Sequence, residues 1–184
     1  MCGDVDVILS HRDEEKTRGL VVDVVASLEA DGWITHTLTL NTTTGDRNQQ
    51  TLPYRGNGKG RGFDSLDKAL CVWQDPGYGS EAHAKNPNIH RRVDIIVSRW
   101  RTVGCAILGW SGATTFERDI RRWCKREKGW KFDSSGVRDR ATGLVVDLER
   151  PEKEGDGDSW LDRERRLMEG LGIGWRDPTE RCTG

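Results

Sequence analysis

The sequence has no hydrophobic run that approaches the ~20 apolar residues needed to cross a bilayer. Its first residues also lack the basic and then apolar pattern of a signal peptide. We therefore expect neither a membrane protein nor a visibly secreted one. The 184 residues, of which 34% are hydrophobic and 32% charged, are enough for one domain or two small ones.

The sequence also lacks the paired spacing of cysteine or histidine ligands that is typical of zinc sites and redox centres. The four histidines form no cluster. The five cysteines are widely separated, at Cys2, Cys71, Cys105, Cys124 and Cys182. We expect reduced thiols in an intracellular compartment.

No phosphate-binding loop can be identified from its glycine spacing. The run at residues 56–62 is rich in glycine, but it fits neither the Walker pattern nor the dinucleotide fingerprint. The whole segment 41–62 is polar and too poor in apolar residues to pack as a helix or strand. We expect a long mobile loop there.

The net charge of -1 argues against a protein that simply coats nucleic acid. The charges are nevertheless segregated along the chain. Residues 99–131 contain nine basic and three acidic side chains, whereas residues 147–169 contain five basic and nine acidic ones. A phosphate backbone would be attracted to the first region and repelled by the second.

Hydrophobic periodicity predicts an alternation of strands and helices. Strands are predicted over residues 4–9, 34–40, 93–97, 130–132 and 144–148, and helices over residues 14–30, 102–108, 114–127 and 161–170. In the first strand Val5, Val7 and Leu9 alternate with polar positions, which is typical of a half-buried strand. Phe116, Ile120 and Trp123 are expected to form the buried stripe of the third helix.

Three aspartates in predicted strands are the candidate catalytic residues. Asp4 and Asp6 project from one face of their strand with Cα atoms ~7 Å apart, close enough to bind one metal site. Asp94 lies within an apolar strand, where its charge is costly unless a metal or the neighbouring Arg92 compensates it. Carboxylates of this kind suit Mg²⁺ and two-metal phosphoryl transfer. The alternative is that Asp4 and Asp6 are only solvated residues of a strand edge.

Several segments resemble the family X DNA polymerases in order and in spacing. They are residues 3–7 (GDVDV), 91–97 (RRVDIIV), 108–112 (LGWSG) and 116–122 (FERDIRR), with a closing segment at residues 171–181. The resemblance implies an α+β fold in which a nucleotidyltransferase-like palm, with a mixed β-sheet flanked by helices, is followed by a small α/β domain. The palm would comprise residues 1–108, including the loop at 41–62, and the second domain residues 109–184.

The resemblance also implies roles for individual residues. Asp4, Asp6 and Asp94 would be the catalytic, metal-binding residues, with Mg²⁺ as the cofactor and Mn²⁺ as the alternative. Asp94 would also accept the proton of the primer 3'-hydroxyl, and Arg92 would hold Asp94 in place. Contacts with the nucleotide would come from Gly3, Gly109, Trp110, Ser111, Gly112 and Glu117. Contacts with DNA would come from Arg118, Arg121 and Arg122.

Three positions distinguish this chain within the family. Gly109-Trp110 is the form found in polymerase mu and terminal transferase, whereas polymerases beta and lambda carry Tyr-Phe. Because Gly109 has no side chain, weak discrimination against ribonucleotides is expected, and Gly109→Tyr is expected to restore it by ~1 to 3 kcal/mol. Ala113 lacks the usual hydroxyl of this turn. Glu117 resembles terminal transferase, and the long loop would bring Arg55, Lys59 and Arg61 near DNA ends.

Family members have helical DNA-gripping domains and a triphosphate-binding serine and arginine before the first catalytic strand. This sequence starts at Met1, so we expect a fragment, a misassigned start codon, or missing parts that are encoded elsewhere. Its partners would be primer-template or broken DNA ends, deoxynucleoside triphosphates and, through the missing regions, end-joining proteins of the nucleus. Three functions stay open: a template-directed polymerase for gap filling and end joining, a template-independent terminal transferase, and a non-catalytic remnant that binds DNA.

Overall fold

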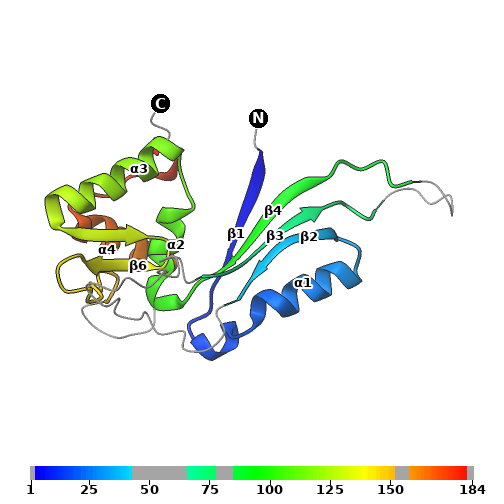
Figure 1. Ribbon diagram of the computed structural model, residues 1–184, viewed down its shortest axis with the longest axis horizontal. Helices are drawn as coiled ribbons and strands as arrows, with labels where there is room; N and C mark the ends of the chain where they lie inside the picture. The colour runs from blue at the N-terminus through cyan, green and yellow to red at the C-terminus, as the bar shows by residue number, and fades with distance from the viewer. Residues whose placement is uncertain (1–2, 43–65, 78–84, 152–157, 182–184) are drawn as a thin grey trace, which may run out of the picture. The chain divides into compact units, whose positions relative to one another are not determined.

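A computed structural model describes residues 3–42, 66–77, 85–151 and 158–181 of the chain (Figure 1). The predicted loop at 41–62 lies outside the described residues from residue 43 onward. Packing separates the described residues into two compact units, with residues 3–42, 66–77 and 85–97 in the first and residues 98–151 and 158–181 in the second. We describe each unit by itself.

The first unit is a four-stranded mixed sheet with a helix on one face (Figure 1). Its elements are β1 (Asp4–Leu9), α1 (Leu20–Ala30), β2 (Ile34–Asn41), β3 (Asp67–Trp73) and β4 (Arg91–Val97). The strand order is β1-β4-β3-β2, in which β1 runs parallel to β4 and the other neighbouring pairs are antiparallel. This mixed sheet with its helix confirms the predicted α+β fold class.

The core of the first unit lies between α1 and the sheet. Val21 and Val25 of α1 pack against Ala69, Cys71 and Ile95 of the two central strands. All five side chains are buried, and burying each of the larger aliphatic ones, Val21, Val25 and Ile95, is worth about 1.5–3 kcal/mol. The α1 face of the sheet therefore holds the core of this unit.

The start of α1 differs from the prediction of a helix from residue 14. A short 3-10 turn, Glu14–Thr17, comes first, and α1 begins only at Leu20. Gly19 separates the two with a φ of 70°, a left-handed conformation that interrupts the helix and that glycine adopts without steric cost. The predicted helix was too long because the apolar spacing alone does not reveal this break.

The first strand is less buried than its alternating pattern predicts. Val5 and Val7 are 47% and 37% exposed. The reason is the strand order, because β1 is an edge strand and α1 packs on β2, β3 and β4. Only the end of β1, at Leu9, joins the core beneath α1.

The second unit combines three helices with a β-hairpin (Figure 1). Its elements are α2 (Val103–Gly109), α3 (Thr114–Trp123), a π-helical turn (Cys124–Lys128), β5 (Trp130–Asp133), β6 (Gly136–Asp139) and α4 (Trp160–Leu171), with 3-10 turns at Trp100–Thr102 and Pro178–Glu180. The core unites Leu108 of α2, Ile120 of α3, Phe132 of β5 and Leu167 of α4. α2 packs on α4 and β5, so it belongs to the second unit. The boundary between the two units therefore falls after Val97, whereas the sequence placed it after residue 108.

Two details of the second unit correct the sequence predictions. The strand predicted at 144–148 is wrong, because this segment contributes only one bridge, from Val145 to Arg138. The partner of β5 is β6, whose single apolar residue, Val137, is too weak a signal to predict a strand. Trp123 was predicted to be buried with Ile120, but it is 40% exposed and its indole N–H donates to the carbonyl of Leu171 at 2.9 Å.

Among the residues that the structure describes, no helix has both the length and the hydropathy required for a bilayer crossing. This agrees with the absence of a long apolar run in the sequence.

Candidate active site

The three candidate carboxylates lie on two neighbouring strands of the first unit. In the parallel pairing of β1 and β4, Asp4 lies beside Arg92 and Asp6 beside Asp94. The alternate β4 residues, Val93 and Ile95, pack beneath α1. Since successive strand residues point to opposite faces, Asp4, Asp6 and Asp94 share the face that α1 does not cover.

Arg92 bridges two of these carboxylates. Its Nε donates to Asp94 Oδ1 at 3.0 Å and its Nη2 to Asp94 Oδ2 at 3.2 Å. The same Nη2 also donates to Asp4 Oδ2. The Asp94 side chain is 4% exposed, so its charge lies in a poorly solvated place, and a two-point contact with an arginine is the strongest compensation a side chain can supply.

The oxygen donors at this place suit a magnesium ion in their chemistry. However, no group of three His, Cys, Asp or Glu residues within the described ranges stands in an arrangement that could hold a metal ion. At the aspartates, the guanidinium of Arg92 supplies the positive charge beside Asp4 and Asp94. A bound metal would have to take over Asp4 from Arg92.

Gly3, which was predicted to contact the nucleotide, immediately precedes β1. A Cβ atom built on Gly3 would meet nothing within 4 Å. Nothing within the described part of the chain therefore requires glycine at this position, and its predicted role depends on a ligand.

The remaining predicted nucleotide residues lie in the second unit, where α2 ends and α3 begins. Gly109 is the last residue of α2, and Trp110, Ser111 and Gly112 form the turn that leads to α3. Gly112 has a φ of 92°, and a Cβ atom there would lie 2.8 Å from Cβ of Arg181. This turn therefore requires glycine for a local steric reason.

A buried arginine for which the sequence predicts no role holds this turn in place. Arg181 is completely buried, and its Nη1 donates to Ser111 Oγ at 2.8 Å and to Glu164 Oε1 at 2.6 Å. Its Nε and Nη2 donate to the carbonyl of Arg176 at 3.1 and 2.8 Å, and its own carbonyl accepts the N–H of Ala113 at 2.9 Å. The only sequence signal for this role is the place of Arg181 in the closing segment, since nothing in that segment predicts a buried charge.

Gly109 packs directly against the β5–β6 turn. A Cβ atom at position 109 would lie 2.9 Å from both Cα and Cβ of Ser134. These atoms belong to the backbone or are bonded directly to it, so they cannot swing away. The glycine therefore has a packing role that is independent of any choice of sugar.

We expect Gly109→Ala to destabilise the second unit by about 1–3 kcal/mol, because the new methyl group overpacks the contact with Ser134. Thermal unfolding of the chain measures this effect. Gly3→Ala is the matched control, since a methyl group there meets open space. A Gly109→Ala protein as stable as the unmodified one would show that the β5–β6 turn shifts at no cost.

The contact of Gly109 with Ser134 also affects the test of sugar discrimination by Gly109→Tyr. Gly109→Tyr would displace Ser134 as well as fill the sugar site, so a changed ratio of ribo- to deoxyribonucleotide use in that variant would have two causes. Weak discrimination by the unmodified protein stays a prediction, and it is best measured without a substitution at 109.

The predicted DNA-contacting arginines are exposed on α3. Arg121 pairs with Glu117 at 3.2 Å and Arg122 with Asp119 at 3.2 Å, while Arg118 is also exposed. Burial raises the pKa of Glu117, an effect that Arg121 partly opposes. Pairs this exposed contribute little to stability, so their arginines can turn to phosphate groups at small cost.

Two family models of known proteins match the chain. A family model described as DNA polymerase beta palm matches residues 1–99, and one described as DNA polymerase beta thumb matches residues 106–182. The chain is 28% identical to DNA polymerase lambda of Rattus norvegicus over 181 residues, which are 98% of this chain and 26% of the relative.

Two further relatives match smaller shares. DNA-directed DNA/RNA polymerase mu of Homo sapiens is 26% identical over 141 residues, covering 74% of this chain and 27% of the relative. DNA nucleotidylexotransferase of Monodelphis domestica is 28% identical over 109 residues, covering 59% of this chain and 18% of the relative. The chain thus spans about a quarter of the length of the relatives it matches most fully. With the palm model matching more than half of its residues, the chain belongs to the family X DNA polymerases.

Proposed function

We propose that this chain carries the catalytic centre and the nucleotide-contacting turn of a template-directed DNA polymerase that acts in gap filling and end joining. The observation that carries the proposal is the β1–β4 register, which places Asp6 beside Asp94 on the face of the sheet that α1 does not cover, with Asp4 on the same face beside Arg92. Three carboxylates on one face are oxygen donors that suit the divalent metal ions of two-metal phosphoryl transfer.

In this proposal Asp4, Asp6 and Asp94 bind magnesium, which when bound neutralises the phosphate charge that develops during transfer. Asp94 accepts the proton of the primer 3'-hydroxyl, a role that suits a buried carboxylate held in one orientation by Arg92. Arg92 would keep Asp94 in this orientation. A bound metal would replace the contact between Arg92 and Asp4.

The second unit supplies the grip on the nucleotide and on DNA. The turn at 109–112 lies beneath the sugar and base of the incoming nucleotide, together with Glu117. Arg118, Arg121 and Arg122 bind phosphate groups or the minor groove from the exposed side of α3. A nuclear location and contacts with end-joining proteins belong to this proposal and have no signal in the described residues.

A second function is template-independent addition of nucleotides. It is favoured by Gly109-Trp110 and Glu117, which resemble terminal transferase, and by the similarity to the nucleotidylexotransferase of Monodelphis domestica.

Primer extension distinguishes these functions. We expect a fusion of this chain to the amino-terminal part of rat polymerase lambda to extend a primer on a gapped template with Mg²⁺, and to stop when the metal is chelated. The chain alone is expected to be a poor enzyme, because positioning provides most of the catalysis in phosphoryl transfer. Extension of a single-stranded primer without template would favour the terminal transferase. DNA binding with no incorporation under either condition would favour the third function, a non-catalytic remnant that binds DNA.

A further inference from the structure

A buried carboxylate holds the amino end of α2. Glu149 is 2% exposed, and it accepts the backbone N–H of Gly104 at Oε2 and that of Cys105 at Oε1, both at 2.8 Å. The first amides of a helix have no partner within the helix, and an ionised carboxylate is the acceptor that suits them best. Each oxygen of Glu149 is used by one amide, so the contact fixes both the position and the direction of this helix end.

α2 also contacts its neighbours closely at both of its ends. At its start, a Cβ atom on Gly104 would lie 2.8 Å from the backbone nitrogen of Glu164, so α2 touches the backbone of α4 there. At its end, Gly109 touches Ser134 in the same way. A helix of seven residues is only about 10 Å long, and a shift at one end reaches the other.

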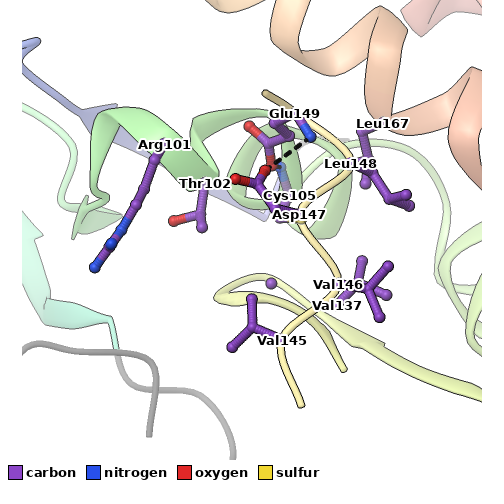
Figure 2. Close-up of a pocket in the computed structure, with 11 residues that line it drawn as sticks. Arg101, Thr102, Cys105, Val137, Val145, Val146, Asp147, Leu148, Glu149 and Leu167 are labelled. Atoms are coloured by element: carbon purple, nitrogen blue, oxygen red, sulfur yellow. Dashed lines mark hydrogen bonds between the residues drawn. The ribbon is translucent and has the colours of Figure 1, made fainter. Parts of the chain in front are cut away.

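Glu149 also lies beside a cavity of about 80 Å³ (Figure 2). The charged or titratable groups around the Glu149 carboxyl group are Cys105 on α2 and Arg163 on α4. Arg101 and Asp147 line the cavity beside it. Burial raises the pKa of Glu149 to about 7, against the opposing effects of the bonds from Cys105 and Gly104 and of the charge of Arg163. The carboxyl group therefore changes its protonation state near neutral pH.

We propose that Glu149 is a positioning residue for the nucleotide-contacting turn, and that it acts through the two amides at the amino end of α2, whose other end continues into that turn. The contact itself stands on geometry alone, whereas its effect on nucleotide binding rests on the proposed function. When the carboxyl group is ionised, both amides are bonded. When it is protonated, one oxygen carries a hydrogen and is a poor acceptor, so α2 is held less firmly and the turn binds the nucleotide more weakly.

The folding stability of the unit and the affinity of the turn for nucleotide then change in opposite directions with pH. The folded-state pKa of Glu149 lies above its ordinary value of 4.5, so its contribution to folding stability is full below that value and is lost as pH rises through about 7. The affinity for nucleotide, in contrast, improves as pH rises through the same range. A residue with a purely structural role would change both in the same direction.

The first test is an amide titration of the unmodified chain by NMR. We expect the amide resonances of Gly104 and Cys105 to shift with pH around a midpoint of about 7. The shift should vanish in Glu149→Gln and persist in Glu169→Gln, which removes an exposed carboxylate from α4 in the same unit. Two amides that do not titrate near neutral pH in the unmodified chain would overturn the proposal.

The second test is the pH dependence of nucleotide incorporation by the fusion to the amino-terminal part of polymerase lambda. We expect KM for the nucleotide to fall as pH rises from 6 to 8 in the unmodified protein. In Glu149→Gln we expect KM to be about three- to tenfold higher at pH 8 and to lose this pH dependence, with kcat within about twofold. An unchanged KM in an active Glu149→Gln protein would overturn this inference alone. A fusion that incorporates no nucleotide at any pH would instead overturn the proposed function and the nucleotide role of Glu149 with it.

Discussion

Replacing Asp94 with asparagine is expected to abolish nucleotide incorporation by the fusion protein, with a loss of at least about a thousandfold in kcat. The substitution removes a metal ligand and the proton acceptor together, and about 4 kcal/mol of lost transition-state stabilisation corresponds to roughly this factor. Single-turnover primer extension with saturating Mg²⁺ measures the effect. Folding and DNA binding should be nearly unchanged, because asparagine has the same shape and Arg92 keeps its contact with Asp4.

The matched control is Asp23→Asn, which removes an exposed carboxylate from α1 in the same unit and should leave incorporation as it was. Thermal unfolding and a DNA-binding titration of the Asp94→Asn protein separate loss of chemistry from loss of structure. Near-normal turnover of the Asp94→Asn protein would show that the β1–β4 carboxylates are not the catalytic centre.

Breaking the ion pair of Arg181 with Glu164 is expected to cause the largest loss of stability. The two side chains are 0% and 1% exposed, and removing one partner leaves a buried charge without compensation. We expect Arg181→Met to lower the free energy of unfolding by about 3–5 kcal/mol. Denaturant unfolding of the chain measures this directly. The variant also removes the bond to Ser111, so the turn it fastens should bind nucleotide more weakly.

A double-mutant cycle shows whether the charge itself is responsible. The Arg181→Met, Glu164→Met double variant should recover much of the loss, since a buried pair can often be replaced by apolar side chains at little net cost. A single Arg181→Met protein as stable as the unmodified chain would contradict the buried pair. A double variant that is no more stable than the single one would indicate that the hydrogen bonds to Arg176 and Ser111, rather than the charge, stabilise this region.

The elements that the sequence predicted well are those with a strong local signal. β4 combines consecutive apolar residues with a short length, and α4 has an apolar stripe and a capping box between Ser159 and Asp162. The failures have equally local causes. The helix break at Gly19 depends on one backbone conformation, and β6 contains only Val137 as an apolar residue, so neither leaves a periodic pattern.

The candidate site was predictable in part for the same reason. The two-residue period of a strand is sufficient to put Asp4 and Asp6 on one face, and an acid within an apolar strand marks Asp94. Pairing between strands distant in sequence is not encoded in any local pattern. That Asp6 lies beside Asp94, and that Arg92 contacts Asp4 as well as Asp94, follows from the register of β1 with β4.

By itself, then, the sequence determined the family, the α+β class and the placement of Asp4 and Asp6 on one face of a strand, because these depend on residue types at fixed spacings along the chain. Only the tertiary structure decided which groups support the turn at residues 109–112. Arg181, Glu164 and Glu149 are charged residues that a pattern assigns to the surface, yet all three are buried. Their opposite charges, the Ser111 hydroxyl and the helix amides that they contact lie 17 to 70 positions away in the sequence, so only folding brings these groups together.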